Sequence, residues 1–273
     1  MPLLRRDDEI EIFWEERGAD SGPLVVLAPY CISHPSVFDP LGAELAPDHR
    51  IVRYDDRGSG ASTHRGPYDM ETGAADLEAV LEAAGGSAVV VALADCVNRA
   101  VRVAASRPDL VEALVVPGGN PAGRRSLEGT DAMVSSDTVV DAMISMVETD
   151  YRGAVRSLTT AGNPQMSEDE VRERVKLQVA YQPQETAASR LRAWAEDDAA
   201  EPGRQCGDRL WLLYSDDAGG GWFPVGDEGR NLARRLFPEA HVEKIEDGIV
   251  SRPDLTGGAV KRITAGLRLE SGA

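Results

Sequence analysis

Ile51 to Ser62 read IVRYDDRGSGAS, a short apolar run followed at once by a turn rich in aspartate and glycine. Continuous apolar runs of this length are typical of strands that are buried on both faces of a sheet. Glycine and aspartate end such strands because glycine tolerates unusual backbone angles and the aspartate side chain satisfies turn amides. The stretch therefore predicts a buried strand over Ile51–Tyr54 that ends in a tight turn over Asp55–Ser59.

Similar patterns recur along the chain, and helical stretches separate them. Glu9–Glu15 alternates apolar and charged residues, as a half-buried edge strand does. The other strand candidates are Pro23–Ala28, Val89–Leu93, Leu114–Val116, Leu210–Tyr214 and His241–Ile245. The helix candidates between them are Met70–Ala84, Asn98–Ser106, Asp227–Leu236 and Leu255–Leu267. Alternation of strands and helices predicts an α/β fold with a mostly parallel, doubly wound sheet of about eight strands.

The strand signal disappears between about Gly119 and Gly207. This region instead contains four helical patterns, at Ser136–Val147, Tyr151–Thr160, Ser167–Tyr181 and Gln184–Trp194. Ser167 and Glu170 have the spacing of a capping box at the start of the third helix. We therefore expect an α/β core over 1–118 and 208–273, with a helical cap or lid over 119–207. The alternative is a set of extra packing helices that gate nothing.

Composition narrows the classes of function. The 273 residues include 46 acidic and 29 basic side chains, so the net charge is -17. Such a surface repels nucleic acids and anionic membranes, and we expect a small-molecule partner instead. No apolar run reaches the roughly 18 residues of a membrane helix, and the start lacks the apolar stretch of a leader.

Cysteine usage and motifs are equally restrictive. The chain has three cysteines, an odd number without a close pair, so neither a disulfide framework nor a zinc site is expected. We expect a reducing, cytoplasmic location. No motif for a metal, a dinucleotide or another cofactor is present, so none is expected. The sequence leaves the oligomeric state open.

Two motifs carry a resemblance to a known family. Arg53–Ser62 resembles the Asp-x-Arg-Gly-x-Gly-x-Ser turn of the α/β-hydrolase superfamily, and Arg107–Val116 resembles the stretch that follows its nucleophile helix. The order of strands and helices is similar as well. The resemblance implies an α/β-hydrolase fold with a helical cap, which esterases and epoxide hydrolases share. It implies little about the substrate, because one fold hosts many activities.

The resemblance also implies where a nucleophile would lie. Members of this superfamily carry it in Gly-x-Ser-x-Gly, on a sharp turn between a strand and a helix. Counting back from Pro108 places that turn on Ala92–Cys96, with Ala94 at the serine position. Alignment shifts of one or two residues would place Asp95 or Cys96 there instead. A third interpretation makes Cys96 a small buried residue that replaces a glycine.

The other catalytic positions differ unequally from the family pattern. Asp217 fits the triad acid, although a turn role in its Asp- and Gly-rich loop is equally reasonable. The histidine position is Ile249, which can neither accept nor donate a proton. The oxyanion His-Gly is replaced by Pro29 and Tyr30, and proline has no N–H to donate. These replacements argue against ordinary triad hydrolysis.

Only four histidines could take over as the base. His34 follows the Leu24 strand on the side where ligands bind, so it is the candidate; as a loop residue it could also be merely solvated. His49 precedes a strand, at the opposite end of the sheet. His64 follows the glycine turn and is expected to be exposed, and His241 opens a strand about eight residues too early.

Three functions remain open. One is a non-hydrolytic enzyme of lyase, isomerase or cyclase type that shapes a small, largely apolar substrate and uses general acid–base groups. The second is a non-catalytic ligand-binding or interaction protein. The third is a hydrolase with an unusual aspartate or cysteine nucleophile.

A ligand site is expected where the loops at the carboxyl ends of the strands meet. Its catalytic candidates are Asp95, Asp217, His34 and Cys96, and its binding candidates are Tyr30, Ala94, Trp222 and Ile249. Asp95 is the first choice for a general acid or base, because burial would raise the pKa of a carboxylate there. On that interpretation, Asp95→Asn reduces turnover but leaves the fold intact.

Overall fold

A computed structural model describes residues 3–6, 9–128, 131–216, 226–245 and 253–271. Within these residues, eight strands form one sheet in the order β1-β2-β4-β3-β5-β6-β7-β8. The strands are β1 (Leu3–Arg5), β2 (Glu11–Gly18), β3 (Leu24–Leu27), β4 (Arg50–Tyr54), β5 (Ala88–Val91), β6 (Val111–Pro117), β7 (Leu210–Tyr214) and β8 (His241–Lys244). Strands β4 to β8 and β3 run parallel, whereas β1 and β2 pair antiparallel at one edge. The predicted mostly parallel sheet is confirmed.

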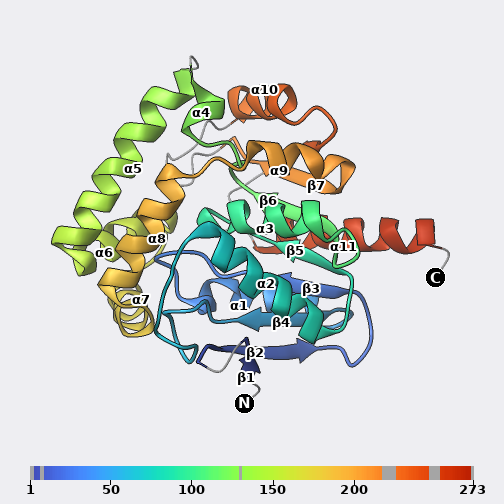
Figure 1. The fold of residues 1–273 in the computed structure, drawn as a ribbon, viewed down its shortest axis with the longest axis horizontal. Helices are drawn as coiled ribbons and strands as arrows, with labels where there is room; N and C mark the ends of the chain where they lie inside the picture. The colour runs from blue at the N-terminus through green and yellow to red at the C-terminus, as the bar shows by residue number, and fades with distance from the viewer. Residues whose placement is uncertain (1–2, 7–8, 129–130, 217–225, 246–252, 272–273) are drawn as a thin grey trace.

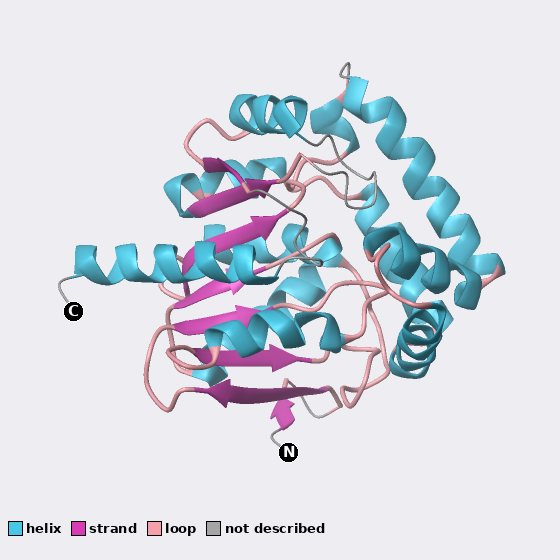
Figure 2. Ribbon diagram, turned by 180° about the vertical axis from the view of Figure 1, so that it is seen from behind, coloured by secondary structure: helices cyan, strands magenta, loops and turns pink. Residues whose placement is uncertain are grey.

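Helices cover both faces of the sheet (Figures 1 and 2). Buried side chains of one face pack with α2 (Met70–Ala84), α3 (Asp95–Ser106) and α10 (Gly226–Leu236). Those of the other face pack with α1 (Asp39–Leu45) and α11 (Pro253–Ser271). The central strands β3 and β5 are buried at every residue, which explains their unbroken apolar runs.

Helix α2 shows how local sequence fixes the element ends. The Asp69 side chain accepts a hydrogen bond from the Thr72 N–H at 2.7 Å and so caps the first turn. The helix ends at Gly85, whose φ of 90° is a left-handed conformation that favours glycine. The helix bounds therefore coincide with those predicted from the sequence.

The described residues between β6 and β7 form helices joined by loops, with no strand. They contain α4 (Arg124–Leu127), α5 (Asp131–Thr149), α6 (Tyr151–Gly162), α7 (Glu168–Tyr181), α8 (Gln184–Glu196), α9 (Ala200–Gln205) and a short 3-10 helix at Gly207–Arg209. The predicted capping box of Ser167 and Glu170 is present. Figure 2 shows α5 to α8 beside the carboxyl ends of the parallel strands. The helices are confirmed, whereas the division into core and cap domains stays a prediction.

Helices α5 to α8 share a small apolar core of their own. Val147, Val155, Val171 and Leu191 are buried in it, and Cys31 from the loop after β3 joins them. Helices α5 to α8 thus pack on the loop after β3 as well as on one another. In the part of the chain that the structure describes, no helix has the length and hydropathy to cross a membrane.

Candidate functional site

The turn between β5 and α3 has an unusual backbone. Ala94, directly before the first residue of α3, has a φ of 47° and a ψ of -129°. A residue with a Cβ rarely adopts a positive φ, and such strain clusters at functional sites. The predicted sharp strand-to-helix turn is therefore present, and its central side chain is a methyl group.

Asp95, the next residue, is held on all sides. Its side chain is 1% exposed. One carboxylate oxygen accepts the backbone N–H of Cys31 at 2.6 Å. The other lies 3.1 Å from an Arg99 guanidinium nitrogen and 2.8 Å from an Arg190 nitrogen. The carboxylate thus connects the loop after β3, helix α3 and helix α8.

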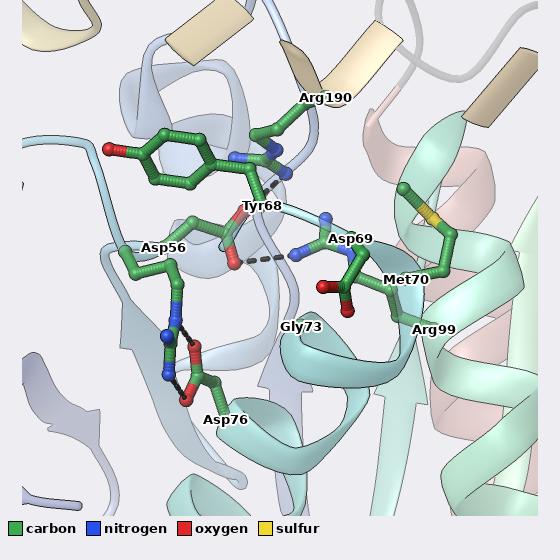
Figure 3. A pocket seen from close by; sticks show the side chains of 9 residues that line it. Asp56, Tyr68, Asp69, Met70, Gly73, Asp76, Arg99 and Arg190 are labelled. Atoms are coloured by element: carbon green, nitrogen blue, oxygen red, sulfur yellow. Dashed lines mark hydrogen bonds and ion pairs between the residues drawn. The ribbon is translucent and has the colours of Figure 1, made fainter. Parts of the chain in front are cut away.

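A second aspartate closes this group into a ring. Asp56, from the turn after β4, lies 2.6 Å from Arg99 and 2.5 Å from Arg190. Asp56, Asp95, Arg99 and Arg190 form what we call the buried ion-pair ring, in which each arginine contacts both aspartates and each side chain is at most 5% exposed. Figure 3 shows Arg99 and Arg190 converging on Asp56. The ring carries no net charge, which is how buried charges are tolerated.

The ring borders a small cleft that is partly open to solvent. Its other wall comes from α2 and the loop before it, with Tyr68, Met70 and Gly73 (Figure 3). Arg57 binds Asp76 across this cleft at 2.5 and 2.7 Å. The charged groups here are thus paired with each other rather than directed at a ligand.

The ring reverses the expected protonation behaviour of Asp95. Burial alone would raise the pKa of this carboxyl, but Arg190 and Arg99 outweigh burial and hold the pKa below its usual range. The prediction of a raised pKa is therefore wrong, because it considered the burial of the carboxylate without the two arginines that pair with it. A carboxylate that stays ionised and fully paired is a poor general acid or base at neutral pH.

The loop after β3 has its amides occupied by side chains. Besides the Cys31 N–H on Asp95, the Ile32 N–H donates to Gln182 Oε1 at 3.0 Å. Ile32 has a φ of 59°, so it too lies in the left-handed region. Gln182 follows α7 and also donates to Ser59 Oγ at 3.1 Å. Two consecutive N–H groups of this loop thus point at acceptors that belong to the protein itself.

Cys96 points into the core beneath α3. It is fully buried among apolar residues of the first core cluster. Burial raises the pKa of its thiol to about 12. A thiol that stays protonated in an apolar environment is a weak nucleophile. The structure matches the interpretation of Cys96 as a small core residue.

Tyr30 and His34 flank the loop after β3. The Tyr30 ring packs edge-on against Phe38 at 6.1 Å between centroids, and burial raises its pKa, so the phenol stays protonated. His34 is partly buried, and its ring contacts Tyr181 edge-on at 5.2 Å. Burial and, next, the positive charge of Arg174 lower the pKa of His34, so its imidazole is neutral at pH 7.

The hydrogen bonds of His34 fix which nitrogen holds its proton. Nδ1 accepts the Ser36 N–H at 3.2 Å and lies 2.9 Å from Ser36 Oγ. A neutral imidazole with Nδ1 as acceptor carries its proton on Nε2. His34 can therefore donate a hydrogen bond from Nε2, but it offers no free acceptor there. No hydrogen bond or ion pair joins it to Asp95 or Cys96 within the described residues.

The other three histidines make their contacts away from the loop after β3 and the turn before α3. His49 is buried and its Nε2 lies 3.0 Å from Thr264 Oγ1, at the amino end of β4. His241 opens β8 and stacks on Trp211 at 3.8 Å. His64 is exposed, as expected.

Part of the predicted site can be assessed directly. The segments Pro29–His34 and Ala94–Cys96 do meet, through the contact of Cys31 with Asp95. Asp217, Trp222 and Ile249, which were expected to complete the site, lie outside the described residues. In the described part of the chain, no group of three or more His, Cys, Asp or Glu side chains is arranged to hold a metal ion.

Comparison with known proteins places this geometry in a fold. No protein-family model and no curated protein sequence matches the chain. Solved structures do. An esterase from Exiguobacterium antarcticum superposes with a TM-score of 0.81 at 16% identity, covering 96% of this chain and 98% of that one.

Two further structures agree with it. E-2-(acetamidomethylene)succinate hydrolase has a TM-score of 0.71 at 20% identity, covering 93% of this chain and 95% of its own. MGS-M2, an α/β-hydrolase enzyme from a Medee basin deep-sea metagenome library, has 0.72 at 16% identity, covering 100% and 98%. This chain has the α/β-hydrolase fold. Identities this low establish the fold and leave the activity open.

The fold gives the site its frame of reference. In the α/β-hydrolase fold, the nucleophile projects from the turn where β5 meets α3 here. The oxyanion is bound by the N–H after the nucleophile and by an N–H of the loop after β3. Ala94 lies on the turn between β5 and α3, and Cys31 lies on the loop after β3. The assignment of Ala94 to the nucleophile position stays a prediction.

Sequence reasoning missed Arg99, Arg190, Asp56 and Gln182 as site residues. One signal was available for Arg99, because it lies four residues after Asp95 on the same helix, the spacing of an intrahelical ion pair. The contact with Arg190 spans 95 residues, and no local pattern announces such a contact.

Proposed function

We propose that this chain does not hydrolyse esters and instead binds a small, largely apolar molecule without covalent chemistry, at the carboxyl edge of the sheet. One observation carries the proposal: the Asp95 carboxylate already accepts the Cys31 N–H that an oxyanion would need. A negative charge fixed there repels the developing charge that a hydrolase must stabilise. Losing one oxyanion donor typically costs a hydrolase about 3 kcal/mol of transition-state stabilisation.

The other described groups support the same conclusion. Ala94 offers a methyl group at the nucleophile position, and Cys96 is buried and protonated. The sequence places Ile249, which has no titratable group, at the histidine position. A triad mechanism needs nucleophile, base and oxyanion donors together. The replacements at these positions argue that the triad is degenerate.

The expected ligand follows from what remains available. The amides of Cys31 and Ile32 are already paired, so a ligand meets few free donors on this loop. His34 can offer one N–H from Nε2, whereas the protonated Tyr30 phenol already forms a hydrogen bond with Ser33. Pockets with few polar groups select apolar molecules and orient them by one or two hydrogen bonds.

A non-hydrolytic enzyme is the second candidate, and one observation favours it. The neutral His34 imidazole carries its proton on Nε2, so it could donate a hydrogen bond to a carbonyl and promote an isomerisation or elimination. Asp95 is a weak base for such a reaction, because Arg190 and Arg99 lower its affinity for a proton.

Two assays test the proposal. First, activated p-nitrophenyl esters of two, four and eight acyl carbons are incubated with the protein and with Ala94→Ser. We expect no turnover above the buffer rate from either, because a restored hydroxyl still lacks a base and an open oxyanion site. Turnover by the unmodified chain comparable with that of a triad esterase would overturn the proposal.

Second, a library of small apolar molecules is screened by thermal shift. Each hit is recovered after incubation and analysed by liquid chromatography and mass spectrometry. Binding without chemistry predicts hits that raise the melting temperature and return with unchanged mass and unchanged retention time. A hit returned as an isomer or fragment would support the second candidate. His34→Ala should then abolish the conversion.

A further inference from the structure

Helix α8 is tied to the core where the chain enters it. Tyr181, the last residue of α7, donates its hydroxyl to Asp55 at 3.0 Å and accepts the Gly60 N–H on its carbonyl at 2.8 Å. Gln182 donates to Ser59 at 3.1 Å. These contacts all fall on the Asp- and Gly-rich turn after β4. The turn within Arg53–Ser62, which carried the resemblance to the α/β-hydrolase superfamily, is thus also where the cap contacts the core.

The same helix is tied at its middle and at its far end. Arg190 lies 2.5 Å from Asp56 and 2.8 Å from Asp95, inside the buried ion-pair ring. Asp197, which follows α8, accepts from Arg102 of α3 at 2.6 and 3.0 Å. Movement of α8 away from the core would therefore break ion pairs at two separate places and leave their charges without partners. A charge left buried without its partner is strongly unfavourable.

The two connections between cap and core are also joined to each other. The Ala199 N–H donates to the Pro121 carbonyl at 3.1 Å. Ser126 donates to Asp198 at 2.9 Å from its hydroxyl and at 2.7 Å from its N–H. A hinged lid needs connections that change conformation freely. Here the segment that leads into the cap and the segment that leads out of it are hydrogen-bonded to each other.

Close approach of the cap is built into the turn itself. A Cβ at Gly58 would lie 2.6 Å from Thr186 Cγ2 of α8, and one at Gly60 would lie 2.6 Å from the Tyr181 ring. Both glycines have positive φ values, of 79° and 55°. Glycine is therefore required twice, once by the backbone angle and once by the neighbouring helix.

We propose that the cap is a fixed roof: α8 is latched to the core by the buried ion-pair ring, and it opens only when the whole domain unfolds. A ligand then enters and leaves without the cap lifting. The inference rests on described contacts alone and does not depend on the proposed function. A catalytic and a non-catalytic chain would both show it.

Native-state hydrogen exchange tests the latch on the full chain without any ligand. Amides of α8 should exchange within about tenfold of those of β5 and β6, because opening free energies reach the global value only in segments that unfold with the core. Arg190→Met removes the cap's partner in the ring while keeping the apolar stem. We expect α8 exchange to become at least about tenfold faster than sheet exchange in this variant.

Arg192→Met is the matched control. Arg192 lies on the same helix, is 59% exposed and pairs with Glu148 inside the cap. The Arg192→Met variant should leave the hydrogen exchange of the α8 amides unchanged relative to that of the sheet amides. The proposal fails if α8 of the unmodified protein exchanges hundreds of times faster than β5 and β6, or if Arg190→Met and Arg192→Met behave alike. If Arg190→Met does not fold, exchange in the unmodified protein decides.

Discussion

Replacing Asp95 with asparagine separates a structural role from a catalytic one. The change removes one negative charge from a ring of two aspartates and two arginines, so Arg99 and Arg190 are left to share Asp56. Asparagine can still accept the Cys31 N–H, but its amide cannot pair with both guanidinium groups. Removing one partner of a buried ion pair typically costs about 3–5 kcal/mol. For a domain of this size, each kcal/mol lowers the melting temperature by roughly 2–4 °C, so a loss of about 10 °C is expected.

The assay is thermal and urea unfolding followed by circular dichroism, with Asp109→Asn as the control. Asp109 also pairs with an arginine, at 2.8 Å from Arg107, but its side chain is 61% exposed. Exposed pairs contribute little, so the control should melt with the unmodified protein. The catalytic interpretation of Asp95 made the opposite prediction, namely an intact fold with lost turnover. If Asp95→Asn melts within 2 °C of the control, the ring is not what holds this region together.

Three further outcomes follow from the same contacts. The difference in unfolding free energy between the unmodified protein and Asp95→Asn should be constant above about pH 5 and shrink below about pH 4. Asp95 stabilises the fold only while its carboxylate is ionised, its pKa is lowered in the fold, and an unfolded aspartate titrates near 3.9. Denaturant titrations at pH 7, 5 and 3 measure this difference, and a difference that stays constant contradicts the prediction. All three thiols should resist Ellman's reagent at pH 8 until urea unfolds the chain, since burial raises the pKa of Cys96 to about 12 and of Cys206 to about 11; a thiol that reacts at once in the native protein would refute this. Gly60→Ala should lower the free energy of unfolding in urea more than Gly85→Ala does. Both glycines have a positive φ, but only at Gly60 would an added Cβ lie within 3 Å of a carboxylate and an aromatic ring. Equal losses of stability would show that the cap does not press on this turn.

Much of the fold was predictable because its signals are local. Val89–Leu93 is apolar at every position since β5 is buried on both faces, and α2 carries its own cap and its own terminating glycine. Strand β1 was missed because Leu3–Arg5 is too short to show a period. The turn at Ala94 could be placed by counting from Pro108, and its backbone angles agree with that position.

The electrostatics of the site could not be predicted in the same way. Asp95 was correctly placed beside the strand-to-helix turn, but its protonation state depends on Arg190, which lies 95 residues further on, and on Arg99. A buried carboxylate titrates high when alone and low beside a cation. Only the packing of α8 against α3 and the loop after β3 decides between these cases.

The filled loop amides give a physical reason for the position of Asp95. A working hydrolase keeps oxyanion N–H groups open for the transition state, although unpaired buried donors reduce stability. Under the proposed function no oxyanion forms, and an acceptor supplied by the chain itself then stabilises the fold. Asp95 and Gln182 are such acceptors, for Cys31 and Ile32. A buried carboxylate needs cations, and Arg99 and Arg190 supply them, so the Asp95 side chain connects the occupied loop amide to helix α8.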